Sequence, residues 1–161
     1  MKYAALMEHP IHFLSLGFGS GLAKKAPGTF GTVAAIRVVI LAADLGHTGF
    51  IIATLLACVV GVFFCDFTAK AMGVHDHPAI VWDEIAGFMV AMIAVPISWQ
   101  TILVAFILFR IFDIAKPWPI RLLDRHVHGG LGIMLDDILA GLATLAILHA
   151  FLQYGLLYQV T

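Results

Sequence analysis

The sequence predicts an all-α protein, a polytopic membrane bundle of about five apolar helices joined by short interfacial helices. Two observations support this class. Hydrophobic residues make up 61% of the 161-residue chain and charged residues only 12%, whereas soluble globular domains have about a quarter of their residues charged. The apolar runs are longer than ten residues, are rich in Ala, Leu and Met, and lack the alternation of strands. We expect one domain over residues 1–161.

The first two apolar runs are residues 29–43 and 49–65. Arg37 interrupts the first run, and a charge in such a position usually faces the bundle interior or extends to the membrane surface. No charged residue occurs between Leu45 and Cys65. This length is close to the ~20 residues that a membrane-spanning helix requires.

The other three apolar runs are residues 85–97, 102–112 and 138–161. The first two of these are shorter than ~15 residues, too short to span a membrane alone. We therefore expect their helices to continue into the polar residues at their ends. A soluble bundle is the alternative for such short runs, but the uncharged run at 138–161 argues against it.

Five crossings would bring three polar segments to one side of the membrane: residues 16–32, 66–84 and 113–137. Eight of the nine basic residues lie on or next to that side, and Arg37 is the exception. The positive-inside rule then makes that side cytoplasmic. The topology predicted from hydropathy and the distribution of basic residues therefore agree.

Acidic residues gather at the predicted starts of two helices. Asp83 and Glu84 precede the third run, and Asp136 and Asp137 precede the fifth. Carboxylates at a helix N-terminus also stabilise the helix through its dipole, which is the alternative explanation for each pair. Two pairs and Asp113 at one membrane face would repel one another unless cations bind, and oxygen ligands suit Mg²⁺.

A glycine follows each acidic pair, Gly87 four residues after Asp83 and Gly141 four residues after Asp137. Each glycine shares a helix face with its carboxylate and permits close approach of another helix or a ligand. We predict Mg²⁺ as the cofactor. The predicted metal ligands are Asp83, Glu84, Asp136 and Asp137, and the predicted catalytic residues are these four with Asp113.

Groups that could bind a phosphorylated substrate lie in the same three polar segments. Arginine can hold a phosphate with two parallel hydrogen bonds, although basic residues beside a membrane also serve topology and attraction to anionic lipids. The glycine-rich segment exposes backbone N–H groups that can face an anion if a helix starts near Thr29. The predicted substrate-binding residues are Gly28, Thr29, Asp76, Lys116, Arg121 and Arg125.

Several phosphatase chemistries are excluded because their motifs are absent. The sequence has no Cys-x5-Arg nucleophile, no Asp-x-Asp-x-Thr/Val motif and no paired His site of the acid-phosphatase type. Metal-assisted attack is the simplest remaining route, with either a metal-bound water or a carboxylate as the nucleophile.

Three long motifs, GFGSGL…APGTFGT, GVHDHPAIVWDEIAGF and FRIFDIAKPWPIRLLDRHVHGGLGIMLDDILAG, occur in this order. With them the chain closely resembles the phosphatidylglycerophosphatase A family from about Phe13 to about Ala150. The resemblance implies a bacterial inner-membrane enzyme built as an all-helical bundle, and the positive-inside rule places its active site on the cytoplasmic side. It also implies Mg²⁺-dependent hydrolysis of phosphatidylglycerophosphate to phosphatidylglycerol and phosphate.

Three other classes of protein are alternatives to a phosphatase. A cation or small-molecule transporter would use the acidic cluster as a pathway and would place carboxylates in the middle of helices. A non-catalytic membrane scaffold has no use for so many charges at one surface. A phosphotransferase of the CDP-alcohol type is excluded because the motif Asp-Gly-x2-Ala-Arg is absent.

Overall fold

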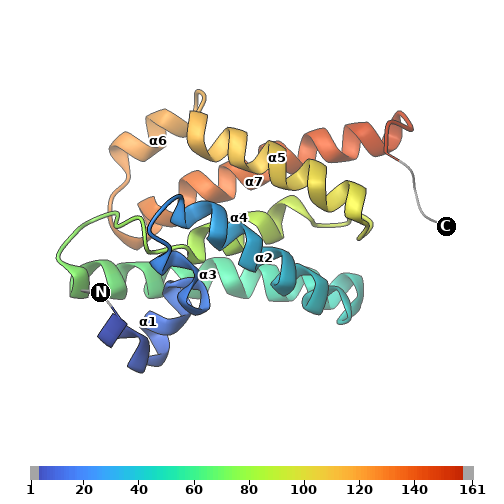
Figure 1. The fold of residues 1–161 in the computed structure, drawn as a ribbon. Helices are drawn as coiled ribbons and strands as arrows, with labels where there is room; N and C mark the ends of the chain where they lie inside the picture. Colours follow the sequence, from blue (N-terminus) through green and yellow to red (C-terminus); the bar gives the residue numbers. More distant parts are fainter. Residues whose placement is uncertain (1–3, 158–161) are drawn as a thin grey trace.

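The computed structural model describes residues 4–157, and every regular element in these residues is helical, as predicted. Figure 1 shows the long helices running along an elongated bundle, with α1 beside α3 and α6 beyond the end of α5. The elements are the 3-10 helix η1 (Ala4–Glu8), α1 (Pro10–Ser15), the 3-10 helix η2 (Gly17–Leu22), α2 (Pro27–Ala43), α3 (Gly46–Met72), α4 (Trp82–Ala91), α5 (Trp99–Ala115), α6 (Ile120–His126) and α7 (Gly129–Gln153).

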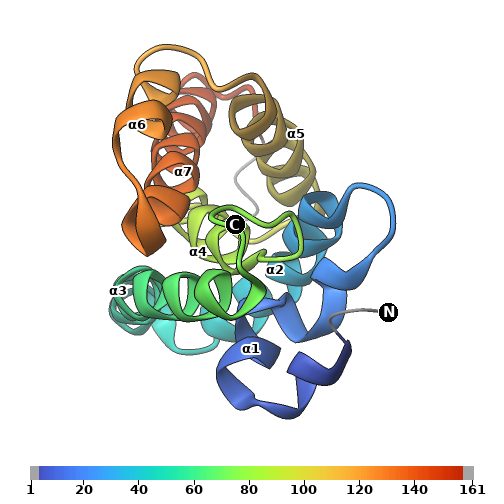
Figure 2. The same ribbon diagram turned by 90° about the vertical axis from the view of Figure 1, so that its left-hand side faces the viewer.

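Helix α4 forms the centre of the bundle. Seen along the bundle in Figure 2, it lies among α2, α3, α5 and α7, and it contacts all four. Every residue from Asp83 to Ala91 is buried, which explains why this run is apolar on all faces. The helix has only 10 residues, a length of ~15 Å, and the remainder of the predicted run 85–97 is not helical.

Helix α7 begins at Gly129, well before the start at residue 138 predicted from hydropathy. The prediction that Asp136 and Asp137 open this helix is therefore wrong, because both lie about two turns inside it. Glycine disfavours a helix, but here the early turns pack closely on α3. A side chain at Gly130 would overlap the Val62 carbonyl oxygen, so tertiary contact outweighs local propensity.

Two other helices also extend beyond their apolar runs. Helix α3 continues through Asp66 to Met72 and ends at Gly73, whose left-handed conformation (φ 68°) is a common helix stop. Helix α5 starts with a capping box between Ser98 and Thr101 and ends at Ala115. The prediction that the fourth run continues into its polar end is confirmed.

All five predicted apolar runs form helices, but their lengths differ. Among residues 4–157, α3 and α7 are the helices that are long and apolar enough to cross a membrane. Large apolar side chains on α3 lie at the surface, with Val59 71% and Leu55 59% exposed. Exposed apolar side chains grouped on one helix are typical of a surface that contacts lipid or another protein. The helix predicted at 138–161 ends at Gln153, and residues 158–161 lie outside the described part.

Candidate active site

A pocket of about 300 Å³ opens where the three polar segments meet. It lies between the start of α2, the segment before α4, the first turn of α4, the end of α5 and the first half of α7. Eight of its lining residues carry acidic or basic side chains, although the surrounding helices are apolar. The residues that line it are Ala26, Pro27, Gly28, Asp76, Pro78, Ile80, Asp83, Glu84, Arg110, Asp113, Ile114, Lys116, Asp136 and Asp137.

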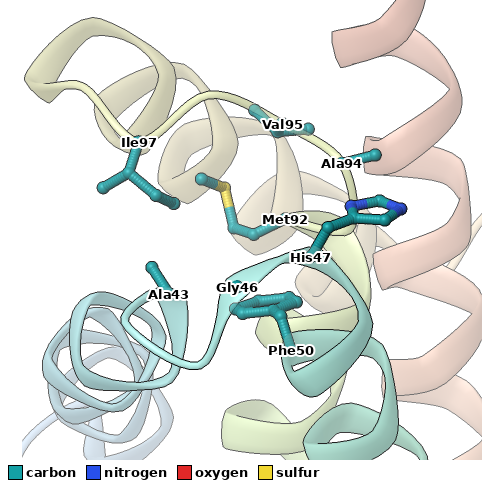
Figure 3. Close-up of a pocket in the computed structure, with 8 residues that line it drawn as sticks. All are labelled: Ala43, Gly46, His47, Phe50, Met92, Ala94, Val95 and Ile97. Carbon is teal, nitrogen blue, oxygen red and sulfur yellow. The ribbon is translucent and has the colours of Figure 1, made fainter.

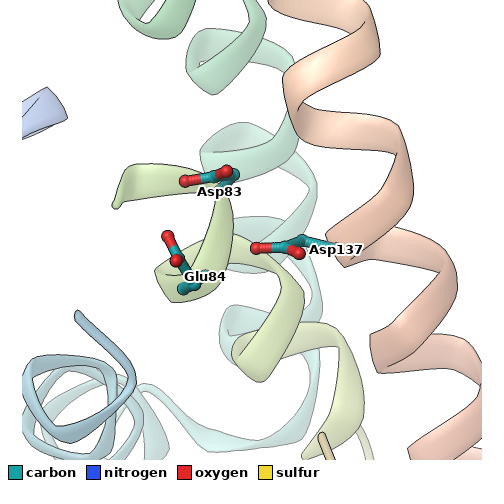
Figure 4. A group of neighbouring side chains, drawn as sticks. All are labelled: Asp83, Glu84 and Asp137. Atoms are coloured by element: carbon teal, nitrogen blue, oxygen red, sulfur yellow. The ribbon is translucent and has the colours of Figure 1, made fainter. Parts of the chain in front are cut away.

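Three carboxylates converge at the base of this pocket. Asp83 and Glu84 stand in the first turn of α4, as predicted, and Asp137 projects toward them from α7 (Figure 4). One oxygen atom from each lies within 4.8 Å of the other two. Each residue also has one buried oxygen without a hydrogen-bond partner: Asp83 Oδ1, Glu84 Oε2 and Asp137 Oδ2.

The protein environment disfavours charge on the carboxylates of α4. Burial raises the pKa of Asp83 well above its ordinary value, and the charge of Glu84 raises it further. Burial likewise raises the pKa of Glu84, with a further contribution from Asp137. Unpartnered buried carboxylate oxygens are rare because they cost free energy, and a bound cation removes that cost.

These three residues fit a hard divalent cation. They offer oxygen ligands from two helices, and Mg²⁺ is usually held by one or two carboxylates together with waters and substrate phosphate. Asp, Glu, His and Cys side chains can all bind metal ions. Among the described residues, these three are the ones whose ligand atoms lie close enough together to share one ion. Asp136, also predicted as a ligand, lines the pocket but is not a member of this group.

Arg110 is a site residue that the sequence analysis did not select. It lies in the next-to-last turn of α5 and forms an ion pair with Asp113, while its Nη1 is 3.9 Å from Glu84 Oε1. Its side chain is only 15% exposed, and its Nε has no partner. The available signal was the spacing of three between Arg110 and Asp113, which places both on one face of a helix.

Lys116 connects the pocket to the neighbouring surface. Its ammonium group lies 2.5 Å from Asp136 Oδ2 and 2.9 Å from Asp124 Oδ1. Burial lowers the pKa of Lys116, but hydrogen bonds to the two carboxylates outweigh this and leave the pKa above its ordinary value. Lys116 is therefore charged at neutral pH and neutralises part of the acidic lining.

Gly28 lies directly over the charged groups. A Cβ atom at this position would meet the Glu84 Oε1 atom and would lie 3.1 Å from Arg110 Nη1. The absence of a side chain therefore lets the ends of Glu84 and Arg110 approach the start of α2 closely. Thr29, also predicted to bind substrate, does not line the pocket, and its N–H donates to the Ala26 carbonyl at the start of α2.

The structure does not bring Arg121 and Arg125 into the acidic pocket. Both are exposed on α6 and line a separate pocket of about 390 Å³. Asp76, in contrast, is exposed and contributes to the rim of the acidic pocket. Of the eleven residues predicted from sequence, eight line the acidic pocket, and Thr29, Arg121 and Arg125 do not.

A second pocket, of about 190 Å³, lies where α2 turns into α3 and α4 ends. Figure 3 shows its lining, which is apolar apart from His47 and includes Phe50 and Met92. No carboxylate lines it. The acidic pocket is therefore the site in which charged chemistry is concentrated.

The helical fold and this pocket define a class of protein. Buried carboxylates face an arginine inside an apolar helical bundle, and such a site suits a phosphorylated ligand bound with a divalent cation. The model of the family Phosphatidylglycerophosphatase A matches residues 13–152 of this chain. The chain belongs to that family, which confirms the resemblance found in the sequence and makes it an enzyme of the phosphatase class.

Curated relatives agree with this assignment. Phosphatidylglycerophosphatase A of Haemophilus influenzae is 49% identical over 159 residues, which cover 98% of this chain and 96% of the relative. Phosphatidylglycerophosphatase A of Escherichia coli K12 is 48% identical over 144 residues, 89% of this chain and 84% of the relative. A putative phosphatidylinositol-3-phosphatase of Bacteroides thetaiotaomicron is 35% identical, covering 80% of this chain and 84% of the relative. No solved structure matches the chain.

Proposed function

We propose that this protein hydrolyses the terminal phosphomonoester of phosphatidylglycerophosphate to give phosphatidylglycerol and inorganic phosphate. We further propose that the reaction requires Mg²⁺ and takes place at the cytoplasmic face of a bacterial inner membrane. The observation that carries the proposal is the set of three buried carboxylates with unpartnered oxygens, placed beside Arg110. We infer the substrate from the names of two relatives that are 48% and 49% identical to this chain.

The charge of the pocket explains why a cation is needed. Six carboxyl groups and two basic groups line it, which gives a formal charge of −4 if all are ionised. A phosphate dianion would be repelled from such a site. Asp83, Glu84 and Asp137 would hold Mg²⁺, with Asp136 beside them. The cation would supply positive charge to the transferred phosphoryl group and activate the attacking group.

The protein side chains then position and stabilise the phosphoryl group. Arg110 can donate to a phosphate oxygen from the pocket wall and stabilise charge that develops during transfer. Asp113 fixes the orientation of Arg110 through their ion pair. Gly28 has no side chain, which lets Glu84 and Arg110 lie against the start of α2.

The bond changes balance without a further reactant. The oxygen of one water molecule, directly or after attack by a carboxylate, becomes bonded to phosphorus. The bond between phosphorus and the terminal glycerol oxygen breaks, and that oxygen takes up a proton as phosphatidylglycerol leaves. Inorganic phosphate is the other product.

We propose that the chain is embedded in the membrane as a multi-pass protein. The apolar surface of α3 supports this, as do the tryptophans at the two ends of α5. Trp99 is 71% exposed at the start of α5, and Trp118 is 82% exposed just beyond its end. Tryptophan favours both membrane interfaces, and the 17 residues of α5 span ~25 Å.

A transporter is the less supported alternative. Asp136 and Asp137 do lie inside a helix, as a transporter would require, but the pocket at the other end of the bundle has no carboxylate in its lining. The carboxylates that would continue a cation pathway to the other membrane face are therefore missing from that pocket. Charged groups gathered in a pocket at one end of the bundle are more typical of an enzyme than of a transporter.

The deciding experiment is phosphate release by the purified protein in mixed micelles. With Mg²⁺ present, phosphatidylglycerophosphate should be cleaved at least ~10²-fold more efficiently than glycerol 3-phosphate, because contacts of the acyl chains orient the reacting group. Chelation with EDTA should abolish turnover, and Mg²⁺ should restore it. Equal rates on both esters would leave a generic phosphatase, and release from neither would refute the proposal.

A further inference from the structure

Two arginines on α6 have no counter-charge in the part of the chain that the structure describes. Among residues 4–157, no carboxylate lies within ion-pair distance of Arg121 or Arg125. The nearest acidic residue in sequence, Asp124, already pairs with Lys116. Uncompensated arginines on an exposed helix are available to an anionic ligand.

The position of Arg121 relates this surface to the acidic pocket. Its Nη2 donates a hydrogen bond of 3.5 Å to the carbonyl oxygen of Ala115. Ala115 stands between Ile114 and Lys116, both of which line the acidic pocket. The guanidinium group therefore lies just outside the rim of the pocket, and Arg125 follows one helical turn later on the same face.

The surroundings of the two arginines suit the headgroup region of a membrane. They share a pocket with Trp118 and Leu122, which are 82% and 48% exposed. Tryptophan prefers the membrane interface, and Leu122 gives the same surface an apolar component. An anion bound there would come from the lipid surface.

The proposed substrate has two phosphates with different chemistry. The terminal phosphomonoester is the group that is cleaved, and the phosphodiester joins the headgroup to diacylglycerol. A glycerol unit separates the two, so both must be accommodated when the first is in the acidic pocket. In the lipid, the phosphodiester is the phosphate nearer the acyl chains, and it is not cleaved.

We propose, on the basis of the proposed function, that Arg121 and Arg125 bind the phosphodiester of the lipid while the acidic pocket holds its terminal phosphate. The prediction from sequence made both arginines substrate-binding residues. The phosphodiester is unchanged by the reaction, so its contacts hold the substrate and transition state equally. The two arginines therefore determine KM rather than kcat.

The test uses the full chain in mixed micelles and the double variant Arg121→Gln/Arg125→Gln. The matched control is Lys24→Gln/Lys25→Gln, which removes two exposed charges from the segment before α2, outside the lining of either pocket. We expect KM for phosphatidylglycerophosphate to rise about tenfold in the arginine variant, as charge-assisted hydrogen bonds are lost, with kcat within about twofold. The control should retain the wild-type KM.

Product inhibition gives a second readout. Phosphatidylglycerol contains the phosphodiester but no terminal phosphate, so its inhibition should weaken about tenfold in the arginine variant. Inhibition by inorganic phosphate, which binds in the acidic pocket, should be unchanged. If the double variant does not fold, the single variants Arg121→Gln and Arg125→Gln are measured in the same way.

Three outcomes would overturn the inference. A loss in kcat at unchanged KM would mean that the arginines act on the transferred phosphate. An equal rise in KM in the lysine control would mean general attraction to the micelle surface, and an unchanged KM in the arginine variants would mean no contact. Failure of the wild-type protein to cleave phosphatidylglycerophosphate would instead refute the proposed function.

Discussion

Gly87 of α4 and Gly141 of α7 face each other across a close contact between the two helices. A Cβ atom on Gly141 would overlap the carbonyl oxygen of Gly87, and one on Gly87 would lie 2.5 Å from the carbonyl oxygen of Asp137. The close approach predicted from the glycine spacing is thus confirmed. It sets the distance between Asp137 and the carboxylates of α4.

We predict that Gly87→Ala reduces both activity and stability. The added methyl group must push α7 away, which separates Asp137 from Asp83 and Glu84. Overpacking of this kind costs ~1–3 kcal/mol in folding free energy, and turnover should fall at least tenfold. Thermal unfolding in detergent and phosphate release are the measurements.

The control for this variant is Ala146→Val, which enlarges an exposed side chain of α7. It should leave the melting temperature and activity near those of the wild type. Wild-type activity in Gly87→Ala would show that the spacing of α4 and α7 is not critical for the site.

Asp137→Asn should lower kcat by at least ~10²-fold while the protein stays folded, because it retains the shape of the side chain and removes its charge. The measurement is phosphate release at saturating Mg²⁺, with circular dichroism as the check on folding. Asp44→Asn is the matched control, since Asp44 is exposed at the end of α2 and does not line the pocket. Near-normal turnover in Asp137→Asn would leave Asp137 a structural role only.

Arg110→Lys should reduce kcat at least tenfold although the positive charge is preserved. A lysine cannot pair with Asp113 and Glu84 and also donate to a phosphate with the geometry of a guanidinium group. Arg37→Lys, at an exposed position of α2, is the control and should behave as the wild type. If both variants keep full activity, Arg110 has no part in stabilising the phosphoryl group.

The proposed orientation makes a prediction about fusion proteins. Alkaline phosphatase is active only after export, so a fusion at the C-terminus should be active and a fusion after Lys70 inactive. The physical basis is the excess of basic residues on the side of the three polar segments. The measurement is alkaline phosphatase activity in intact cells, and the opposite pattern would reverse the orientation.

The helical class, the approximate positions of the apolar helices and most of the acidic site can be predicted from the sequence alone. Long apolar runs without alternation can satisfy their backbone hydrogen bonds only as helices in a membrane. Charges within an apolar chain are costly unless they are used, which is why Asp83, Glu84, Asp113, Asp136 and Asp137 could be selected without a structure.

The boundaries of the helices and the set of residues in the site depend on tertiary packing. Hydropathy placed the start of α7 at residue 138, but packing of Gly130 on α3 extends the helix to Gly129 and puts Asp137 inside it. The partners of Arg110 and the position of Arg121 outside the pocket depend on how α5 and α6 pack against their neighbours. The local sequence pattern does not predict side-chain contacts between distant segments. The free energy that fixes these contacts comes from packing of the whole bundle.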